Sequence, residues 1–163
     1  MPLKLFGALL LAGAGLFGGA SYAAARRRTI AQIGDLCSAL DYMRARIAML
    51  RTPVPDLFAA LAQRTGPSAV LFQDAQRLLA QGLEAAMQQA CSTVEDGQAR
   101  QIMYSLGSVL GRYEADEELR QLDAAIVGLE ARAAQLERDY QGKVPLVRRL
   151  TAAAGICLAI LLL

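Results

Sequence analysis

Apolar side chains recur at every third or fourth position through most of this chain, as they do on one face of an α-helix. The first such stripe covers residues 33–50 and stops at Pro53 and Pro55, which end one helix and can begin the next. No segment between residues 29 and 142 alternates with the period of two that is typical of a strand. We therefore expect an all-α fold. The expected helices lie near residues 33–50, 57–61, 70–79, 83–90, 102–110 and 119–140.

The last of these helices carries a heptad seam three repeats long. Its apolar positions are spaced alternately by three and four residues, and they are Leu119, Leu122, Ile126, Leu129, Ala133, Leu136 and Tyr140. Such a seam fits either a coiled coil with a partner molecule or the long helix of an intramolecular bundle. The five shorter helices also have apolar faces that must be buried, which favours the bundle. The interior is therefore predicted to form an antiparallel bundle of six helices.

Both ends of the chain are apolar and uncharged, over residues 5–25 and 150–163. Basic residues border each end on its inner side, and they are Arg26, Arg27, Arg28, Lys143, Arg148 and Arg149. Lysine and arginine are enriched in segments that stay in the cytoplasm. The pattern predicts two membrane anchors, with both chain ends outside and the interior in the cytoplasm.

The two anchors differ in how well their lengths suit a membrane. The segment 5–25 is long enough to span a bilayer. Lys4 and the small residues before Arg26 are also features of a cleaved signal peptide, but the length and the arginines favour a retained anchor. The segment 150–163 rises only about 21 Å as a helix, which is short for a bilayer. A span is nevertheless favoured over a hairpin or a core helix. The expected organisation is an anchor at 1–25, a cytoplasmic domain at 26–149 and a transmembrane segment at 150–163.

Composition argues against an enzyme and against a nucleic-acid-binding protein. The chain has no His, and no Gly-rich phosphate loop follows a strand, so catalytic triads, most metal sites and bound cofactors are not expected. Residues 29–142 contain ten Lys or Arg against fifteen Asp or Glu, a net charge of −5, which disfavours nucleic acid. The three cysteines, Cys37, Cys91 and Cys157, form no disulfide framework. The excess of apolar residues, with a mean hydropathy of +0.30, instead points to a membrane partner.

An acidic cluster is the densest negative patch in the interior, and its members are Glu114, Asp116, Glu117 and Glu118. It falls where the last helix is expected to begin, and negative charge stabilises the positive end of a helix dipole. The cluster is therefore expected to cap that helix, and it is also our first candidate for contact with a basic partner.

A glycine pair, Gly107 and Gly111, is spaced by four residues in the fifth expected helix. Glycine inside a helix costs about 1 kcal/mol relative to alanine. Two glycines on one helical face therefore predict a crossing with another helix that is too close for a Cβ atom.

Several segments, taken together in their order, resemble a known family, the stage III sporulation protein AB of endospore-forming bacteria. They are the Met-x-Leu-Lys start, the segment 50–56, the motif Leu106-Gly107-x-x-Leu110-Gly111, the long Glu/Arg/Gln helix and the apolar tail. The interior is also distantly similar to the helical domains of F-type platform proteins of type II secretion and type IV pilus systems. The shared steps there are Gly82-Leu83-Glu84-Ala85-Ala86 and the Gly-x-x-x-Gly helix. Ser108 departs from that pattern, and one helical domain is present where those proteins have two.

The resemblance implies a non-catalytic membrane subunit of the channel between mother cell and forespore. Such a subunit would lie in the mother-cell membrane around the forespore, with its bulk in the cytoplasm. It would dock a secretion-type ATPase and contact other channel subunits, and it could form a homo-oligomer. Two alternatives stay open from the residues alone, a platform fragment of a secretion or pilus system and a membrane-anchored coiled-coil tether.

Overall fold

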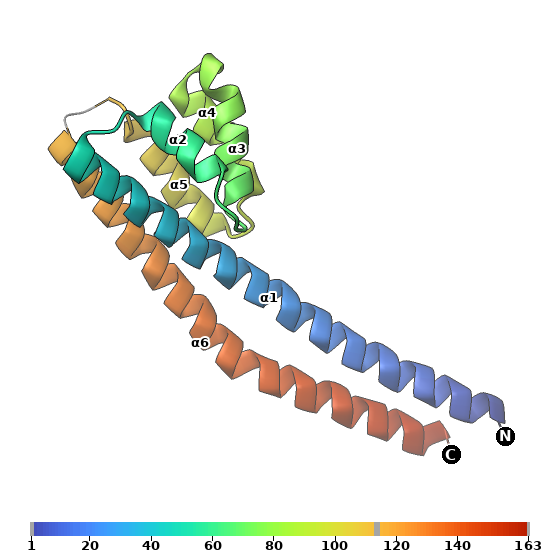
Figure 1. Ribbon diagram of the computed structural model, residues 1–163. Helices are drawn as coiled ribbons and strands as arrows, with labels where there is room; N and C mark the ends of the chain where they lie inside the picture. The colour runs from blue at the N-terminus through green and yellow to red at the C-terminus, as the bar shows by residue number, and fades with distance from the viewer. Residues whose placement is uncertain (1, 113–114, 163) are drawn as a thin grey trace. The chain divides into compact units, whose positions relative to one another are not determined.

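The computed structural model describes residues 2–112 and 115–162, with side chains at 23–112, 115–142 and 153. This part of the chain is helical and contains no strand, so the expected all-α fold with six α-helices is confirmed. Figure 1 labels the α-helices in chain order. They are α1 (Pro2–Leu50), α2 (Val54–Ala62), α3 (Ala69–Leu78), α4 (Leu83–Ala90), α5 (Gly97–Val109) and α6 (Ala115–Leu162), with short 3₁₀ turns at Leu79–Gln81 and Cys91–Thr93.

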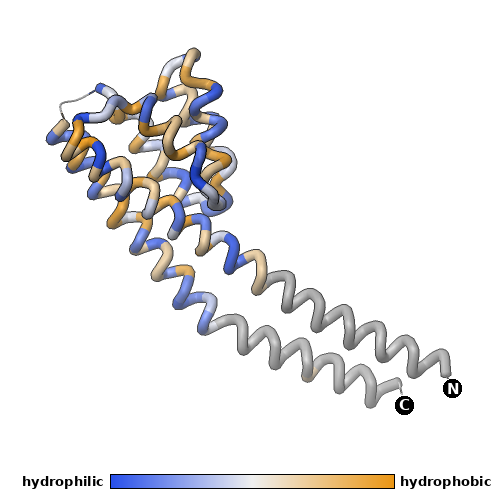
Figure 2. The backbone as a smooth tube through the Cα atoms, in the orientation of Figure 1, coloured by the Kyte–Doolittle hydropathy of each residue, from blue (hydrophilic) through white to orange (hydrophobic). Residues whose placement is uncertain are grey.

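The chain forms two compact units. The bundle unit is Thr29–Ala134, and the terminal unit combines Met1–Arg28 with Gln135–Leu163. Within the bundle unit, α2 packs on α3, α3 on α4 and α4 on α5 (Figure 1). Hydrophilic and hydrophobic residues alternate along these helices (Figure 2), as expected for amphipathic helices that each bury one face.

The core of the bundle unit is built from the apolar stripes that the sequence displays. Phe58 on α2 and Phe72 on α3 meet edge to face, with ring centroids 5.7 Å apart, and both are buried. Such a pair adds about 0.5–1.5 kcal/mol beyond the burial of its area. On α6, Leu122 and Leu129 of the heptad seam are fully buried. This half of the seam is therefore covered within the chain.

Helix ends follow from local sequence. Arg51 closes α1 by taking the left-handed conformation, φ 47°, while its N–H donates to the carbonyl of Ile47. A residue with a Cβ atom adopts this conformation at a cost of about 1–2 kcal/mol. Pro53 then precedes α2 as its N-cap with an extended backbone, and Pro55 occupies the first turn, where a missing N–H is tolerated.

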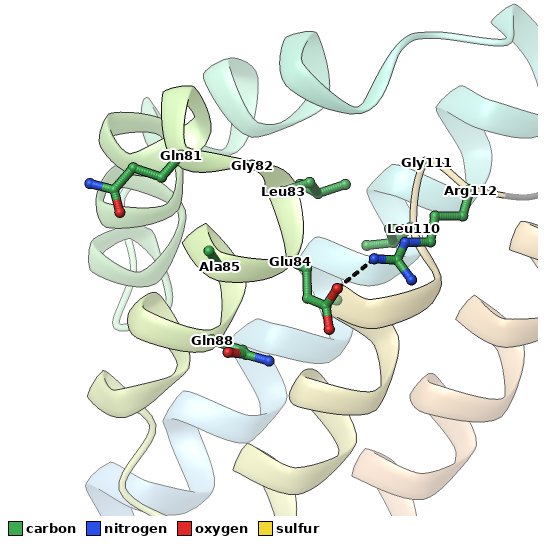
Figure 3. A pocket seen from close by; sticks show the side chains of 10 residues that line it. Gln81, Gly82, Leu83, Glu84, Ala85, Gln88, Leu110, Gly111 and Arg112 are labelled. Carbon is green, nitrogen blue, oxygen red and sulfur yellow. Dashed lines mark hydrogen bonds and ion pairs between the residues drawn. The ribbon is translucent and has the colours of Figure 1, made fainter.

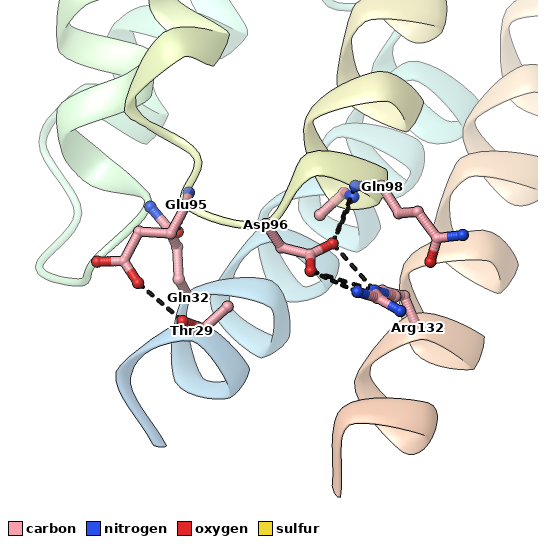
Figure 4. A network of polar contacts seen from close by, with 7 residues as sticks. Thr29, Gln32, Glu95, Asp96, Gln98 and Arg132 are labelled. Carbon is pink, nitrogen blue, oxygen red and sulfur yellow. Dashed lines mark hydrogen bonds and ion pairs between the residues drawn. The ribbon is translucent and has the colours of Figure 1, made fainter. Parts of the chain in front are cut away.

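A network of polar contacts ties the start of α5 to α6 (Figure 4). The Asp96 carboxylate accepts hydrogen bonds from the N–H groups of Gln98 and Ala99, which caps α5. The same carboxylate forms a two-pronged ion pair with the Arg132 guanidinium of α6, with contacts of 2.7–3.2 Å. Both side chains are largely buried, 7% and 19% exposed, so solvent weakens this pair little.

The residues just before Asp96 fix the same loop to α1. The amide of Gln32 donates to the Thr93 carbonyl and accepts from the Glu95 N–H. The hydroxyl of Thr29 donates to the Glu95 carboxylate at 2.7 Å. Within the bundle unit, Thr29 and Gln32 lie at the start of the α1 portion and Arg132 lies near the end of the α6 portion. Arg44, further along α1, pairs with the earlier Asp123 of α6, so the two helices run antiparallel within this unit.

A second carboxylate holds the loop before α3. Asp35 on α1 accepts from both the N–H and the hydroxyl of Ser68, at 2.9 and 2.6 Å. The chain passes so close above it that a Cβ atom on Gly66 would lie 2.3 Å from an Asp35 oxygen. An alanine at this turn would therefore have to displace the Asp35 carboxylate that holds Ser68.

In the terminal unit, the described contacts centre on Tyr140. Its hydroxyl accepts a hydrogen bond from Arg27 Nε at 2.9 Å, and the same guanidinium lies 5.6 Å from the ring centroid. The side chains of Lys143, Arg148 and Arg149 lie outside the described residues, as do nearly all those of the expected anchors. Nowhere in the part of the chain with described side chains is a helix long and apolar enough to cross a membrane.

The ion pair of Asp96 predicts a specific dependence of stability on pH. The pKa of Asp96 is lowered, first because Arg132 donates to the carboxylate; partial burial opposes the shift, and the two N–H groups add to it. A lowered carboxyl pKa stabilises the folded state above the unfolded pKa of about 3.9, and this contribution is lost as the pH falls through the folded value.

We expect Asp96→Asn to lower the free energy of unfolding by about 1.5–3 kcal/mol at neutral pH, because asparagine keeps the cap but loses the charge. The difference in melting temperature from the wild type should stay constant down to about pH 5 and shrink below about pH 4. Glu130→Gln, at an exposed position of α6, is the control and should stay close to the wild type throughout. A difference that is equally large at pH 7 and pH 3 would contradict this assignment.

Candidate functional site

A surface groove of about 460 Å³ lies between the start of α4 and the end of α5 (Figure 3). It is lined by Gln81, Gly82, Leu83, Glu84, Ala85, Gln88, Gly107, Leu110, Gly111 and Arg112. These residues come from two segments separated by some twenty positions in the sequence, 81–88 and 107–112. The second segment contains all but the first residue of the motif Leu106-Gly107-x-x-Leu110-Gly111 of the family resemblance, and the first contains the step Gly82-Leu83-Glu84-Ala85-Ala86 of the more distant similarity to F-type platform proteins.

The base of the groove is a close crossing of α4 and α5 at Gly107. This glycine is buried, and a Cβ atom built on it would lie 2.6 Å from the Cβ of Met87. Real Cβ atoms do not approach so closely, so α5 can lie against α4 here because residue 107 has no side chain. The expected close crossing is thus present at Gly107, with α4 as the partner helix.

The expectation for Gly111 was wrong in one respect. This residue does not share a helical face with Gly107, because α5 ends at Val109 and Gly111 adopts a left-handed conformation with φ 76°. Glycine is favoured beyond a helix end because it takes positive φ without a steric penalty. A Cβ atom at Gly111 would also lie 3.2 Å from Leu83 Cδ2, so the turn packs closely on α4.

Gly82 forms the opposite edge of the groove. Its φ of 104° and ψ of 146° fall in a region open essentially to glycine alone. The residue is the N-cap of α4 and has no side chain that caps this helix. Open space surrounds the position where its Cβ would stand, so the requirement for glycine is conformational rather than steric.

An ion pair crosses the mouth of the groove (Figure 3). The Arg112 guanidinium contacts the Glu84 carboxylate at 2.5 Å, and both side chains are about half exposed. An exposed pair of this kind contributes little to stability, about 0–1 kcal/mol. Its effect is to place one positive and one negative group side by side above an apolar base formed by Leu83 and Leu110.

The acidic cluster adjoins the groove through Glu118. This side chain is buried, and its carboxylate accepts a 2.6 Å hydrogen bond from the N–H of Gly111, so it holds the turn behind the groove. Glu117 accepts from Gln121 and Arg120, which together lower its pKa. Glu117 and Glu118 lie in the first turn of α6.

Of the other two members of the cluster, the structure describes only Asp116. Asp116 lies in the same first turn of α6 and is exposed. Glu114 lies outside the described residues. The expected position of the cluster at a helix start therefore agrees with the described part, while Glu118 belongs to the interior of the turn rather than to its exposed surface.

Other titratable groups offer no metal-binding site in the described part of the chain. No group of three or more His, Cys, Asp or Glu side chains there could hold a metal ion. The thiols of Cys37 and Cys91 are free, and burial raises their pKa to about 11 and about 12. Both thiols therefore stay protonated at neutral pH and behave as small apolar groups.

The fold and the groove together define a small helical-bundle protein with a shallow surface site made of backbone, apolar and paired charged groups. The family model of stage III sporulation protein AB matches residues 4–163, and the chain belongs to this family. The predicted family resemblance is thereby confirmed. This family is a structural component of the sporulation channel and is not known as an enzyme.

A solved structure of a stage III sporulation protein AB has the same fold. It shares 22% sequence identity with this chain, with a TM-score of 0.60. The match covers 70% of this chain and 97% of that protein. A comparison with curated proteins finds no match.

Sequence reasoning named Gly107 and Gly111 but did not find the groove or the Glu84–Arg112 pair. The two partners are 28 residues apart, and no local pattern links them. A usable signal was present at Gly82, since a glycine directly after a helical segment is typical of a position that takes positive φ.

The crossing at Gly107 predicts that two Gly-to-Ala changes have opposite effects. Gly107→Ala should lower the free energy of unfolding by about 1–3 kcal/mol, because the new methyl group must displace Met87. Gly34→Ala is the matched control in α1, where a Cβ would meet nothing within 4 Å. It should raise stability by about 1 kcal/mol through helix propensity. Chemical denaturation of the full chain measures both, and an unchanged or stabilised Gly107→Ala variant would show that α4 and α5 do not cross closely.

Proposed function

We propose that this protein is a non-catalytic platform subunit of the channel between mother cell and forespore, and that its bundle unit docks a secretion-type ATPase through the groove between α4 and α5. The observation that carries the proposal is the meeting of two motifs at one surface. The step Gly82–Ala86 and the motif Leu106–Gly111 both contribute to the groove lining. Gly82 and Gly111 hold positive-φ turns at this exposed surface, and binding sites are often built from such surface turns on a rigid scaffold.

The charge around the groove favours a basic partner surface. The bundle unit contains nine Arg and thirteen Asp or Glu, a net charge of −4. Asp116 and Glu117 stand two residues and one residue from Glu118, which contacts the Gly111 turn of the groove. We propose these two carboxylates as the acidic edge of the docking site. Complementary charge mainly sets encounter rate and orientation, so binding should weaken with added salt.

The apolar ends are proposed as membrane anchors at 1–25 and 150–163. The support is the absence of charge over residues 5–25 and 150–163 and the positive residues beside them, Arg26, Arg27 and Arg28 after the first and Arg148 and Arg149 before the second. Positive charge at this position favours the cytoplasmic side and contact with anionic headgroups. The bundle unit would then lie in the cytoplasm of the mother cell, where a secretion-type ATPase acts.

A coiled-coil tether finds less support. The described seam residues Leu122, Ile126 and Leu129 are buried within the bundle unit. They cannot pair with a second molecule unless the bundle opens. The seam is therefore better accounted for as core.

Filling the groove should abolish ATPase docking without unfolding the protein. Ala85 is exposed and lines the groove, so Ala85→Trp places a large side chain in the site. Ala124→Trp, at an exposed alanine of α6, is the matched control. With the channel ATPase as binding partner, Ala85→Trp should weaken association about tenfold or more while the control stays close to the wild type. Both variants should keep the wild-type melting temperature.

The same binding assay separates docking from capping at the acidic edge. Asp116→Lys combined with Glu117→Lys should weaken binding and reduce its dependence on salt. Binding that survives both this change and Ala85→Trp would remove the groove from the account. A wild-type chain that binds no ATPase at all would overturn the proposed function.

Reporter fusions test the proposed topology. A reporter joined after Leu163 should be active in an assay for extracytoplasmic enzymes, because the segment 150–163 is proposed to cross the membrane. A reporter inserted at the exposed Gly97 should be active only in a cytoplasmic assay. A cytoplasmic signal after Leu163 would remove the second span from the proposal.

A further inference from the structure

Two arginines lie against one tyrosine on the surface of the bundle unit, and none of the three residues is among those that line the groove. The guanidinium carbons of Arg46 and Arg64 lie 5.3 and 5.9 Å from the ring centroid of Tyr42. Arg46 Nε also donates to the Tyr42 hydroxyl at 3.1 Å, and Arg64 donates to the Ser38 carbonyl at 3.3 Å. Stacking on an aromatic ring holds each guanidinium in place while leaving several of its N–H groups directed elsewhere.

The positive charge of this cluster is not neutralised within the described part of the chain. The ion pairs there use other arginines, and they are Arg44–Asp123, Arg77–Asp74, Arg112–Glu84, Arg120–Glu117 and Arg132–Asp96. Arg46 and Arg64 take part in none of them, although acidic residues outnumber arginines in the bundle unit. An arginine pair that is exposed, held in place and left without a carboxylate is a local exception in an acidic domain.

An apolar side chain extends the same surface. Tyr42, Arg46 and Met49 follow one another on α1 at spacings of four and three residues, which puts them on one helical face. Met49 is 82% exposed, more than any other large hydrophobic residue described. Tyrosine, arginine and methionine are the residue types enriched in protein–protein interfaces, and arginine and tyrosine dominate their hot spots.

We propose that the face formed by Tyr42, Arg46, Met49 and Arg64 is a second docking surface, and that it takes an acidic amphipathic segment of a partner protein. Carboxylates of the partner would replace the missing ion-pair partners of Arg46 and Arg64. An apolar residue beside them would cover Met49. This second surface is positively charged, whereas the acidic edge of the groove is negatively charged. The two surfaces therefore select different partner surfaces.

Two other occupants fit the observations less well. An anionic membrane or a nucleic acid would meet the net charge of −4 of the bundle unit, including the exposed Asp41 next to Tyr42. A short acidic segment reaches the two guanidinium groups without approaching the rest of that acidic surface. The arginines also lie near the ends of α1 and α2, where positive charge stabilises the helix dipole, and the test has to separate that role from binding.

The test uses the purified full chain and a labelled amphipathic peptide with Glu on its polar face and Leu on its apolar face, followed by fluorescence anisotropy. Arg46→Glu combined with Arg64→Glu should weaken binding about tenfold or more, and Met49→Ser should weaken it a few-fold. The matched control is Arg77→Glu combined with Arg120→Glu, which makes the same charge change at two exposed arginines. The control should stay within about twofold of the wild type.

Circular dichroism and melting temperature show whether each variant is folded. If the double reversal unfolds the protein, Arg46→Gln with Arg64→Gln replaces it, because glutamine removes the charge but keeps hydrogen-bonding capacity. The proposal is overturned if the wild type does not bind the peptide, if both double variants lose binding equally, or if a Lys-for-Glu peptide binds as well. Binding to phosphatidylglycerol vesicles that depends on Arg46 and Arg64, in place of peptide binding, would also overturn it.

Discussion

The carboxylate of Asp96 is the point on which the arrangement of the bundle unit depends. It caps α5 and pairs with Arg132 of α6, while the residues just before it hold α1. Three helices are thus fixed at the N-terminal end of α5. Because α5 is a short rigid rod of about 20 Å, fixing its start also fixes where its other end meets α4. The groove forms at that end, so a buried ion pair at one end of α5 positions a surface site at the other.

The helices follow from local sequence, and the groove does not. Apolar periodicity and Pro53 define the end of α1 and the start of α2 because both act within a few residues. A spacing of four residues is the same whether the second glycine lies inside the helix or just after its last residue. Gly111 was therefore assigned to the helix. The N–H of Gly111 instead donates a hydrogen bond to Glu118 of α6, which connects the turn after α5 to the next helix.

Buried polar partners likewise escape sequence reasoning. Aspartate is a common N-cap residue, but local sequence does not single out Arg132 as its ion-pair partner among the nine arginines of the bundle unit. The same limit applies at the surface. Which arginines form ion pairs there depends on how the helices pack against one another. Two faces of opposite polarity result, an acidic edge beside the groove and the arginine–tyrosine face of α1. The proposed role in a channel would use distinct surfaces of this kind, since a partner whose charge matches one face is repelled by the like charge of the other.

Hydrogen–deuterium exchange of the full chain, with and without the channel ATPase, tests the central claim that the groove is the docking site. Docking there should slow exchange of the backbone amides in 83–88 and 110–112, because the partner would cover the first turn of α4 and the turn after α5. Amides of α3 should exchange as in the free protein. If the ATPase binds and slows exchange elsewhere while the groove amides are unchanged, the groove is not the docking site and the account is contradicted.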